Sequence, residues 1–314
     1  MKILFWGTPD FAVPSLRAVS DEGFDIVGVV TQPDRPKGRG RRLAPSPVKQ
    51  VALEAGYPVL TPDRPRGDEF LAQIQALEAD VSVVVAYGHI LRREILDVPP
   101  MGSINVHASV LPQLRGAAPI NWAIARGHDT AGVTVMRMVE AMDAGPMLHV
   151  IEEPILADET ASELTLRLSE LGAEALVEGL TLLASGTLEE VEQDHDLATF
   201  APKVDRATAR VDWSRSAQEI AWFIRGMDAV PGAWTELNGS PMKLYRPTVV
   251  SAGDFVSASP GPGTVLATDE AVGVVVATGE GAVALTEVQP PGRRRMSSGD
   301  WIHGRGVEPG QRFE

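Results

Sequence analysis

The stretch Gly102-Ser-Ile-Asn-Val-His-Ala-Ser-Val-Leu-Pro-Gln-Leu-Arg-Gly116 predicts a short buried strand that runs into a loop. We expect the strand at residues 103–107, where alternate side chains point to opposite faces. Asn105 and His107 therefore project side by side. The amide can donate to a developing oxyanion and the imidazole can move a proton near neutral pH, which suits acyl transfer. Read alone, such a pair is more typical of a hydrogen-bonded structural histidine.

Strands and helices alternate around this stretch, which predicts an α/β fold with a doubly wound, Rossmann-like, mostly parallel sheet. The continuous run Val81-Ser-Val-Val-Val-Ala86 is typical of a central parallel strand covered on both faces. Further strands are expected at residues 3–6, 25–31, 59–60, 132–138 and 147–153. Helices are expected at residues 11–19, 47–55, 68–78, 119–126 and 160–184, the last broken at Gly172.

The pattern changes toward the C-terminus and divides the chain into two domains. We expect the first domain at residues 1–185, a linker with fading periodicity at residues 186–205, and the second domain at residues 206–314. In the second domain Ser216-Ala-Gln-Glu219 is a capping box that opens a helix. Short strands separated by Pro and Gly follow, which predicts a small, OB-like antiparallel β-barrel.

Composition is that of an ordinary globular enzyme of 314 residues, 44% hydrophobic and 22% charged. Because cysteine is absent, thiol nucleophiles, disulfides and cysteine metal sites are excluded. The N-terminus lacks a signal-peptide pattern, and no apolar run approaches the roughly 20 residues of a membrane span. We expect a cytoplasmic monomer with no membrane contact. The formal charge of −14 argues against non-specific nucleic-acid binding.

One basic stretch stands against this acidic balance. Its five cationic residues are Arg35, Lys37, Arg39, Arg41 and Arg42. The prolines and glycines among them exclude a regular helix and predict a long, flexible loop at the carboxyl end of a strand. The alternatives are a solvated charge run and a site for a polyanion such as RNA or a nucleotide. Mutual repulsion of five like charges favours the polyanion.

Together these parts resemble the folate-dependent formyltransferase family. The resemblance begins with Asn105-x-His107-x-Ser109-x-Leu111-Pro112, followed by Gly116 and Asp143-x-Gly145. Further matches to the tRNA-acting branch are Gly7-Thr-Pro-Asp-Phe-Ala12, Thr31-Gln-Pro-Asp-Arg-Pro36, Val84-Val-Ala-Tyr-Gly88 and Arg210-Val-Asp-Trp-Ser214. The resemblance covers essentially the whole chain. The chain departs from the family pattern at Ala108, Ala144 and Pro146.

The resemblance implies a reaction in translation initiation. The α-amine of methionine, esterified to initiator tRNA, attacks the formyl carbon of 10-formyltetrahydrofolate and gives N-formylmethionyl-tRNA. Asn105 would donate to the formyl oxygen. His107 would also donate to the oxyanion and help move a proton, and Asp143 would orient His107 or accept the amine proton, directly or through water.

The resemblance also implies two binding regions, and no metal is expected. The pterin and formyl-bearing part of the folate would lie against Ser109, Val110, Leu111, Pro112, Tyr87, Gly88 and Ile90. The tRNA would contact the five cationic residues of the basic loop together with Arg293, Arg294 and Arg295.

Three other functions compete with this one. Another folate formyltransferase would use the same site on a small amine, such as glycinamide ribonucleotide or an amino sugar. A non-catalytic RNA-binding protein would use only the basic loop and the barrel. A nicotinamide-dependent oxidoreductase is disfavoured, because the turn after Gly7 lacks the second glycine of G-x-G-x-x-G.

Overall fold

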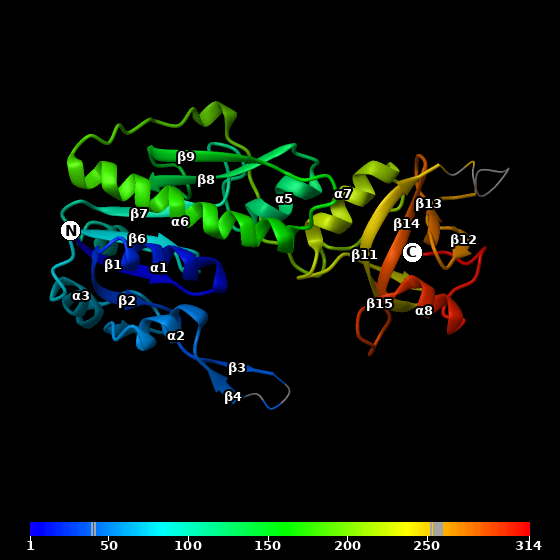
Figure 1. Cartoon of the computed structure of the whole chain (residues 1–314), viewed down its shortest axis with the longest axis horizontal. Coiled ribbons are helices and arrows are strands. Elements are labelled where there is room, and N and C mark those ends of the chain that lie inside the picture. Colours follow the sequence, from blue (N-terminus) through cyan, green and yellow to red (C-terminus); the bar gives the residue numbers. More distant parts are fainter. Residues whose placement is uncertain (39, 41, 252, 254–259) are drawn as a thin grey trace. The chain divides into compact units, whose positions relative to one another are not determined.

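Figure 1 shows a computed structural model of the chain, which describes residues 1–38, 40, 42–251, 253 and 260–314. The expected tRNA contacts Arg39 and Arg41 lie outside the described residues. The chain forms two compact units, each assembled from three segments. The first unit comprises Met1–Gly116, Ala131–Glu153 and Thr165–Ala201. The second comprises Ala117–Thr130, Pro154–Leu164 and Pro202–Glu314.

A seven-stranded sheet organises the first unit, with the order β5-β2-β1-β6-β7-β8-β9. Its strands are β1 (Lys2–Gly7), β2 (Asp25–Val30), β5 (Val59–Leu60), β6 (Val81–Val85), β7 (Ser103–His107), β8 (Thr130–Arg137) and β9 (Met147–Pro154). The pairs from β5 through β7 are parallel, and β7 pairs antiparallel with β8. The predicted doubly wound, mostly parallel sheet is confirmed.

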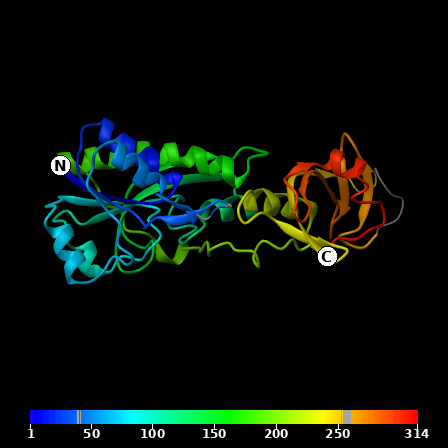
Figure 2. The same cartoon turned by 90° about the horizontal axis from the view of Figure 1, so that it is seen from below.

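Helices cover both faces of this sheet, which is why its central strands are apolar on both sides. They are α1 (Val13–Asp21), α2 (Pro47–Glu54), α3 (Asp68–Gln75), α4 (Arg93–Leu96) and α6 (Ala161–Ser185), with a 3-10 turn at Asp10–Ala12. In Figure 2, α1 and α6 lie on one side of the sheet and α3 on the other. All five residues of β6 are buried, as expected for a strand with no solvent face.

The strand order reverses between β1 and β6, since the chain first builds outward through β2 and β5 and then returns. Ligands of open α/β sheets bind at the carboxyl ends of the strands beside such a reversal. Two side chains tie the segments there together. Thr8 Oγ1 and Gln32 Nε2 both donate to the carbonyl of Tyr87, at 3.0 and 2.9 Å.

Helix α6 is one continuous helix, so the predicted break at Gly172 is wrong. A Cβ atom at Gly172 would lie 3.1 Å from Cγ1 of Val106. The glycine therefore lets the helix approach β7 closely rather than ending it. Because Val106 faces away from Asn105 and His107, α6 covers the back of the strand that carries them.

The basic stretch forms a two-stranded hairpin in its described residues, where the sequence predicts an irregular loop. Strands β3 (Arg35–Lys37) and β4 (Arg42–Ala44) pair antiparallel, with Lys37 opposite Arg42. Pairing of two short strands agrees with the exclusion of a helix.

The second unit is built on an antiparallel sheet with the order β10-β11-β14-β13-β12, and β15 pairs with β14. Its elements are α5 (Pro119–Ala125), α7 (Ala217–Met227), β10 (Trp234–Leu237), β11 (Ser240–Val250), β12 (Val265–Asp269), β13 (Gly273–Ala277), β14 (Ala282–Gln289), β15 (Met296–Ser297) and α8 (Ser298–His303). The predicted capping box at Ser216 and Glu219 is present.

The last residues of the chain join the two edges of this sheet. The N–H of Phe313 donates to Gly263 beside β12 at 2.8 Å, and the N–H of Glu314 donates to Glu236 of β10 at 2.9 Å. This closure gives the barrel character that the spacing of short strands predicts. In the described part of the chain, no helix has both the length and the apolar character needed to cross a membrane.

Candidate active site

Strand β7 presents Asn105 and His107 on one face, as its alternation predicts. Asn105 lies opposite Val84 of β6, and His107 lies opposite Thr134 of β8. His107 is 6% exposed, whereas Asn105 is half-buried. The amide and the imidazole therefore belong to the centre of the sheet near its carboxyl edge.

Hydrogen bonding fixes the form of the His107 ring. Its Nε2 lies 3.1 Å from the carbonyl oxygen of Leu114. Because a carbonyl can only accept, we assign the proton of the neutral ring to Nε2. The other nitrogen, Nδ1, then carries the lone pair, and it lies 3.8 Å from Oδ2 of Asp143.

Asp143 lies in the loop between β8 and β9, with a positive φ of 52°. Aspartate tolerates this left-handed conformation better than most residues. Its Oδ2 accepts the N–H of Gly116 at 2.8 Å. A separation of 3.8 Å between Oδ2 and the lone pair of His107 is too long for a hydrogen bond. Nδ1 of His107 and Oδ2 of Asp143 are therefore two neighbouring acceptors, which can accept a proton from a third group.

Thr134 shapes the loop that follows β7. Its hydroxyl donates to the carbonyl of Ser109 at 2.7 Å and accepts the N–H of Leu111 at 3.1 Å. Ser109 and Leu111 are accordingly 2% and 4% exposed. Of the four loop residues predicted to contact folate, the structure leaves Val110 and Pro112 only half-buried.

The segment after β6 divides in the same way between buried and accessible residues. Tyr87 is 2% exposed and packs edge-on against Trp6, with 5.3 Å between the ring centroids. Burial raises the pKa of its phenol to about 12, and its hydroxyl finds no hydrogen-bond partner among the described residues. Ile90, in contrast, is 87% exposed. Gly88, with φ of 87°, lies between them and is exposed.

Gln193 is a polar residue of this site that the sequence did not indicate. Its Oε1 accepts both Nη2 and Nε of Arg115, at 2.6 and 3.1 Å. Its Nε2 donates to the carbonyls of Asp143 and Gly145, at 3.0 and 2.7 Å. Gln193 and Arg115 are 5% and 6% exposed. Residues 186–201, expected as part of a linker, thus pack against the loop that carries Asp143.

A second set of bonds joins the same segment to the loop after β7. Thr199 accepts the N–H of Leu114 through Oγ1 and the N–H of Arg115 through its carbonyl, both at 2.9 Å. The N–H of Ala201 donates to the carbonyl of Arg115 at 2.7 Å. Gly116 has φ of 119°, and a Cβ there would lie 2.7 Å from the carbonyl oxygen of Ala201. Only glycine therefore fits the position whose N–H binds Asp143.

The cationic side chains that the structure describes in the basic hairpin are those of Arg35 and Arg42. Asp34, the acidic residue within this stretch, forms an ion pair of 2.7 Å with Lys49. Arg35 donates to the neutral amide oxygen of Gln32 at 2.5 Å. Arg42 is exposed on β4.

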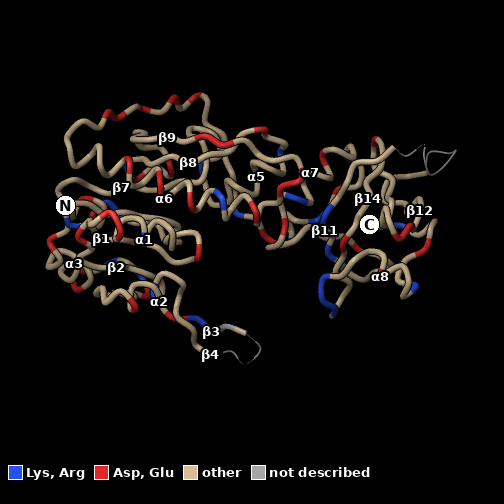
Figure 3. The backbone as a smooth tube through the Cα atoms, viewed as in Figure 1, with Lys and Arg blue, Asp and Glu red and all other residues tan. Residues whose placement is uncertain are grey.

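The three arginines between β14 and β15 fall into two groups. Figure 3 shows this basic loop in blue at the edge of the second unit. Arg293 and Arg294 are exposed. The guanidinium of Arg295, however, lies 3.9 Å from the ring centroid of Tyr245 and 3.2 Å from Oδ2 of Asp228. Its charge is engaged within the unit, a placement that its sequence does not reveal.

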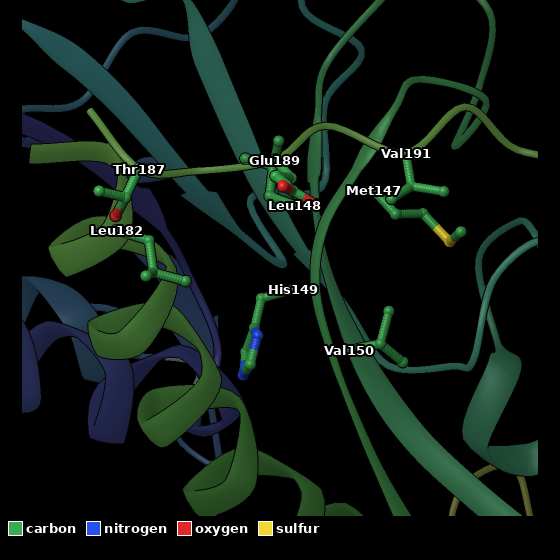
Figure 4. Close-up of a pocket in the computed structure, with 8 residues that line it drawn as sticks. All are labelled: Met147, Leu148, His149, Val150, Leu182, Thr187, Glu189 and Val191. Carbon is green, nitrogen blue, oxygen red and sulfur yellow. The ribbon is translucent and has the colours of Figure 1, made fainter. Parts of the chain in front are cut away.

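Figure 4 shows a hollow of about 400 Å³ elsewhere on the first unit, between β9 and the end of α6. It is lined by Met147, Leu148, His149, Val150, Leu182, Thr187, Glu189 and Val191. As the structure describes it, this lining includes none of the predicted site residues. No group of three or more His, Asp or Glu among the described residues could hold a metal ion.

The first unit is a doubly wound α/β fold with an amide and an imidazole side by side on β7 and a carboxylate 3.8 Å from the imidazole. Residues 1–180 match the family described as Formyl transferase, and residues 203–306 match Formyl transferase, C-terminal domain. The chain belongs to the formyl transferase family.

Two curated relatives are similar along nearly their whole length. The chain is 46% identical to the methionyl-tRNA formyltransferase of Symbiobacterium thermophilum, covering 100% of this chain and 95% of the relative. It is 44% identical to the methionyl-tRNA formyltransferase of Bacillus subtilis, covering 98% of this chain and 96% of the relative.

A solved structure shares the fold at much lower identity. It is an N-formyltransferase from Helicobacter canadensis in complex with folinic acid and dTDP-3-aminofucose. The TM-score is 0.68 at 17% identity, covering 92% of this chain and 99% of that chain.

Proposed function

We propose that this chain transfers a formyl group from 10-formyltetrahydrofolate to the α-amino group of methionine carried by initiator tRNA. The observation that carries the proposal is end-to-end similarity, at 44% and 46% identity, to methionyl-tRNA formyltransferases. These matches extend through the second unit, which carries part of the proposed tRNA surface. The site of Asn105, His107 and Asp143 supports the same chemistry.

The reaction forms one C–N bond and breaks another. The amine nitrogen attacks the formyl carbon, and the carbonyl oxygen becomes an oxyanion in a tetrahedral intermediate. Asn105 is the proposed donor to this oxygen from a fixed position on β7, and one such donor typically accelerates acyl transfer about 10²–10³-fold. Collapse of the intermediate expels N10 of the folate and leaves the formyl group on the amine.

Proton movement is proposed to use the two acceptor atoms that face one another at the site. The attacking amine must lose a proton, and N10 must gain one as it leaves. The lone pair of His107 Nδ1 and Oδ2 of Asp143, 3.8 Å apart, are the proposed receivers. From this place His107 can return the proton to the leaving nitrogen, so that acid and base are the same group.

The formyl donor is proposed to lie beside the accessible members of the predicted folate set. Gly88 and Ile90 after β6, with Val110 and Pro112 after β7, offer backbone and apolar surface to a flat heterocycle. The buried residues Tyr87, Ser109 and Leu111 shape these loops from beneath. An apolar residue as exposed as Ile90, at 87%, is suited to cover a ligand.

The tRNA is proposed to bind cationic side chains on both units. On the first unit these are the residues of the basic hairpin. On the second unit, Arg293 and Arg294 are free of the ionic contacts that engage Arg295. Arg206 and Arg210 are two further exposed arginines, with guanidinium carbons 4.9 and 5.2 Å from the ring centroid of Trp234, and Nη2 of Arg210 also lies 3.9 Å from Oε2 of Glu236. An exposed arginine pair on an aromatic face suits phosphates and nucleobases.

The decisive experiment measures transfer of a labelled formyl group from 10-formyltetrahydrofolate to several acceptors. Charged initiator methionyl-tRNA should accept the label much faster than charged elongator methionyl-tRNA. Glycinamide ribonucleotide and a dTDP-amino sugar test the small-amine alternatives. Transfer to either of them at a comparable kcat/KM would refute the tRNA specificity while leaving the formyl chemistry intact.

Deletion of residues 35–42 tests the basic hairpin separately. The deletion should raise the KM for tRNA strongly and leave the KM for the folate nearly unchanged. Unaltered formylation of methionyl-tRNA by this variant would contradict the proposed role of the hairpin. The same preparations, run by size-exclusion chromatography, test the expected monomer.

A further inference from the structure

Gln193 connects a buried arginine to the loop that carries Asp143. On one side, its oxygen faces the guanidinium of Arg115, at 2.6 Å from Nη2. On the other side, its nitrogen faces the carbonyls of Asp143 and Gly145, at 3.0 and 2.7 Å. All four of these contacts of one amide, including the one to Arg115 Nε, occur at a side chain that is 5% exposed.

The orientation of this amide follows from the chemistry of its neighbours. A guanidinium can only donate and a carbonyl can only accept, so the amide oxygen must face Arg115 and the NH₂ group must face the loop. The amide cannot flip without turning donors toward donors and acceptors toward acceptors. Both hydrogens of one nitrogen are thereby used on two carbonyls that flank Ala144.

The loop so held carries Asp143 in a left-handed backbone conformation. Asp143 has φ of 52°. Among the described residues, its carboxylate accepts one hydrogen bond, from the N–H of Gly116, and it lies 3.8 Å from Nδ1 of His107. Its separation from His107 is set by backbone position rather than by a direct bond between the two side chains. Whatever fixes the carbonyls of Asp143 and Gly145 therefore fixes that separation.

We propose that Gln193 is a positioning residue for formyl transfer, which holds Asp143 at its working distance from His107. This inference rests on the proposed function, because it concerns the proton transfer of the same reaction. Gln193 acts through Asp143 and touches no reacting atom. Misplacement of a reacting group by about 1 Å can reduce turnover on the order of 10²-fold.

The test uses the full chain with Gln193→Ala, Gln193→Glu and Gln193→Met. Steady-state kinetics with saturating initiator methionyl-tRNA and 10-formyltetrahydrofolate should show a loss in kcat of about 10–100-fold for each variant. The KM for each substrate should stay within about threefold, because Gln193 lies outside the proposed binding surfaces. Gln193→Met keeps nearly the same volume, so it carries the test should the alanine variant fold poorly.

Gln193→Glu distinguishes a residue that positions the Asp143 loop from one that only satisfies the hydrogen bonds of Arg115. Glutamate keeps an oxygen for Arg115, and it forms a stronger ion pair there, but it offers no hydrogen to the two carbonyls. A residue needed only to satisfy Arg115 would be replaced well by glutamate, and kcat would be retained. Retained kcat in the glutamate variant would overturn the proposal.

His195→Ala is the matched control, since Nδ1 of His195 also contacts Nη2 of Arg115, at 2.9 Å, on the same segment. It should keep kcat within about threefold of the parent chain. An equal loss in both variants would assign the effect to Arg115 and overturn the role of Gln193. Absence of formyl transfer in the parent chain itself would instead refute the proposed function, so the two failures are distinguishable.

Discussion

At the scale of single residues, the site depends on which groups can donate and which can only accept. Leu114 places the proton of His107 on Nε2 and leaves the lone pair of Nδ1 beside the carboxylate of Asp143. Neither group is satisfied by the other at 3.8 Å. This arrangement is compatible with the proposed transfer of a proton between the reacting amine and these two groups.

His107→Ala removes the proposed proton carrier and should lower kcat on the order of 10²–10⁴-fold, the usual range for general acid–base catalysis. Binding of tRNA should change little, because the imidazole is 6% exposed at the centre of the sheet. Rapid-quench formyl transfer together with filter binding of labelled tRNA measures the two quantities. Unchanged turnover would remove His107 from the proposed proton transfer, whereas tRNA binding without turnover in the parent chain would favour the non-catalytic RNA-binding alternative.

Gly116→Ala should damage both the fold of the loop and the reaction. The new Cβ would meet the carbonyl oxygen of Ala201 at 2.7 Å in a backbone with φ of 119°. An L-residue in this conformation costs more than about 1 kcal/mol of folding free energy. Movement of the Gly116 N–H also releases Asp143. The free energy of unfolding, measured by chemical denaturation, and the turnover number should both fall in the same preparation. Parent values of both quantities would contradict this prediction.

At the scale of secondary-structure elements, the N-terminus of α6 is held by a reciprocal cap. The N–H of Thr160 donates to Glu163 Oε2 at 2.9 Å, and the N–H of Glu163 donates to Thr160 Oγ1 at 3.3 Å. Glu163 Oε1 also lies 2.7 Å from Nη2 of Arg246 on β11. The Arg246 hydrogen bond, followed by that from Thr160, lowers the pKa of Glu163 to about 2.

This lowered pKa predicts a pH-dependent stability. The charged form of Glu163 is favoured in the folded chain, so its contribution is present above the ordinary pKa of 4.5 and is lost as the pH falls toward about 2. Glu163→Gln should cost about 0.5–1 kcal/mol at pH 7, a small value because the side chain is partly exposed. Urea unfolding of both proteins should show the difference shrinking from pH 5 to pH 3. A difference that grows on acidification would contradict it.

The alternation of elements could be predicted from sequence because each strand and cap is a local pattern. Val81–Val85 is apolar at four of its five positions, and Ser216 with Glu219 forms its capping box within four residues. The role of Gly172 cannot be predicted from sequence, because the glycine is required by a tertiary contact with Val106. Gln193 cannot be predicted for the same reason. It is a lone amide in a mainly acidic run, and its hydrogen-bond partners lie about 50 and 80 positions away in the sequence.

At the scale of the whole molecule, the net charge of −14 must be reconciled with a polyanionic substrate. The answer proposed above is local, since a few exposed arginines on each unit meet phosphates within an acidic protein. Arg295 shows that position in a basic run is insufficient, because its charge is engaged by Asp228. Free arginines and paired arginines should therefore differ in their effect on tRNA binding.

Salt dependence measures that difference. The tRNA dissociation constant should rise steeply between 50 and 200 mM salt, as expected when several phosphates are neutralised. Arg293→Ala and Arg294→Ala should each reduce the slope of log Kd against log salt by about 0.7–0.9. The KM for the folate serves as the control and should stay constant. Equal slopes in all variants would remove this loop from the proposed tRNA surface.

Residues 186–201 also determine how the chain can be cut. A fragment that stops at residue 185 would lose Gln193 and Thr199, and with them the bonds to Asp143 and Leu114. Such a fragment would keep Asn105, His107 and Asp143 but would lack the hydrogen bonds that hold the loops around them. A fragment meant to keep the first unit should therefore extend at least to residue 201, where the last segment of that unit ends.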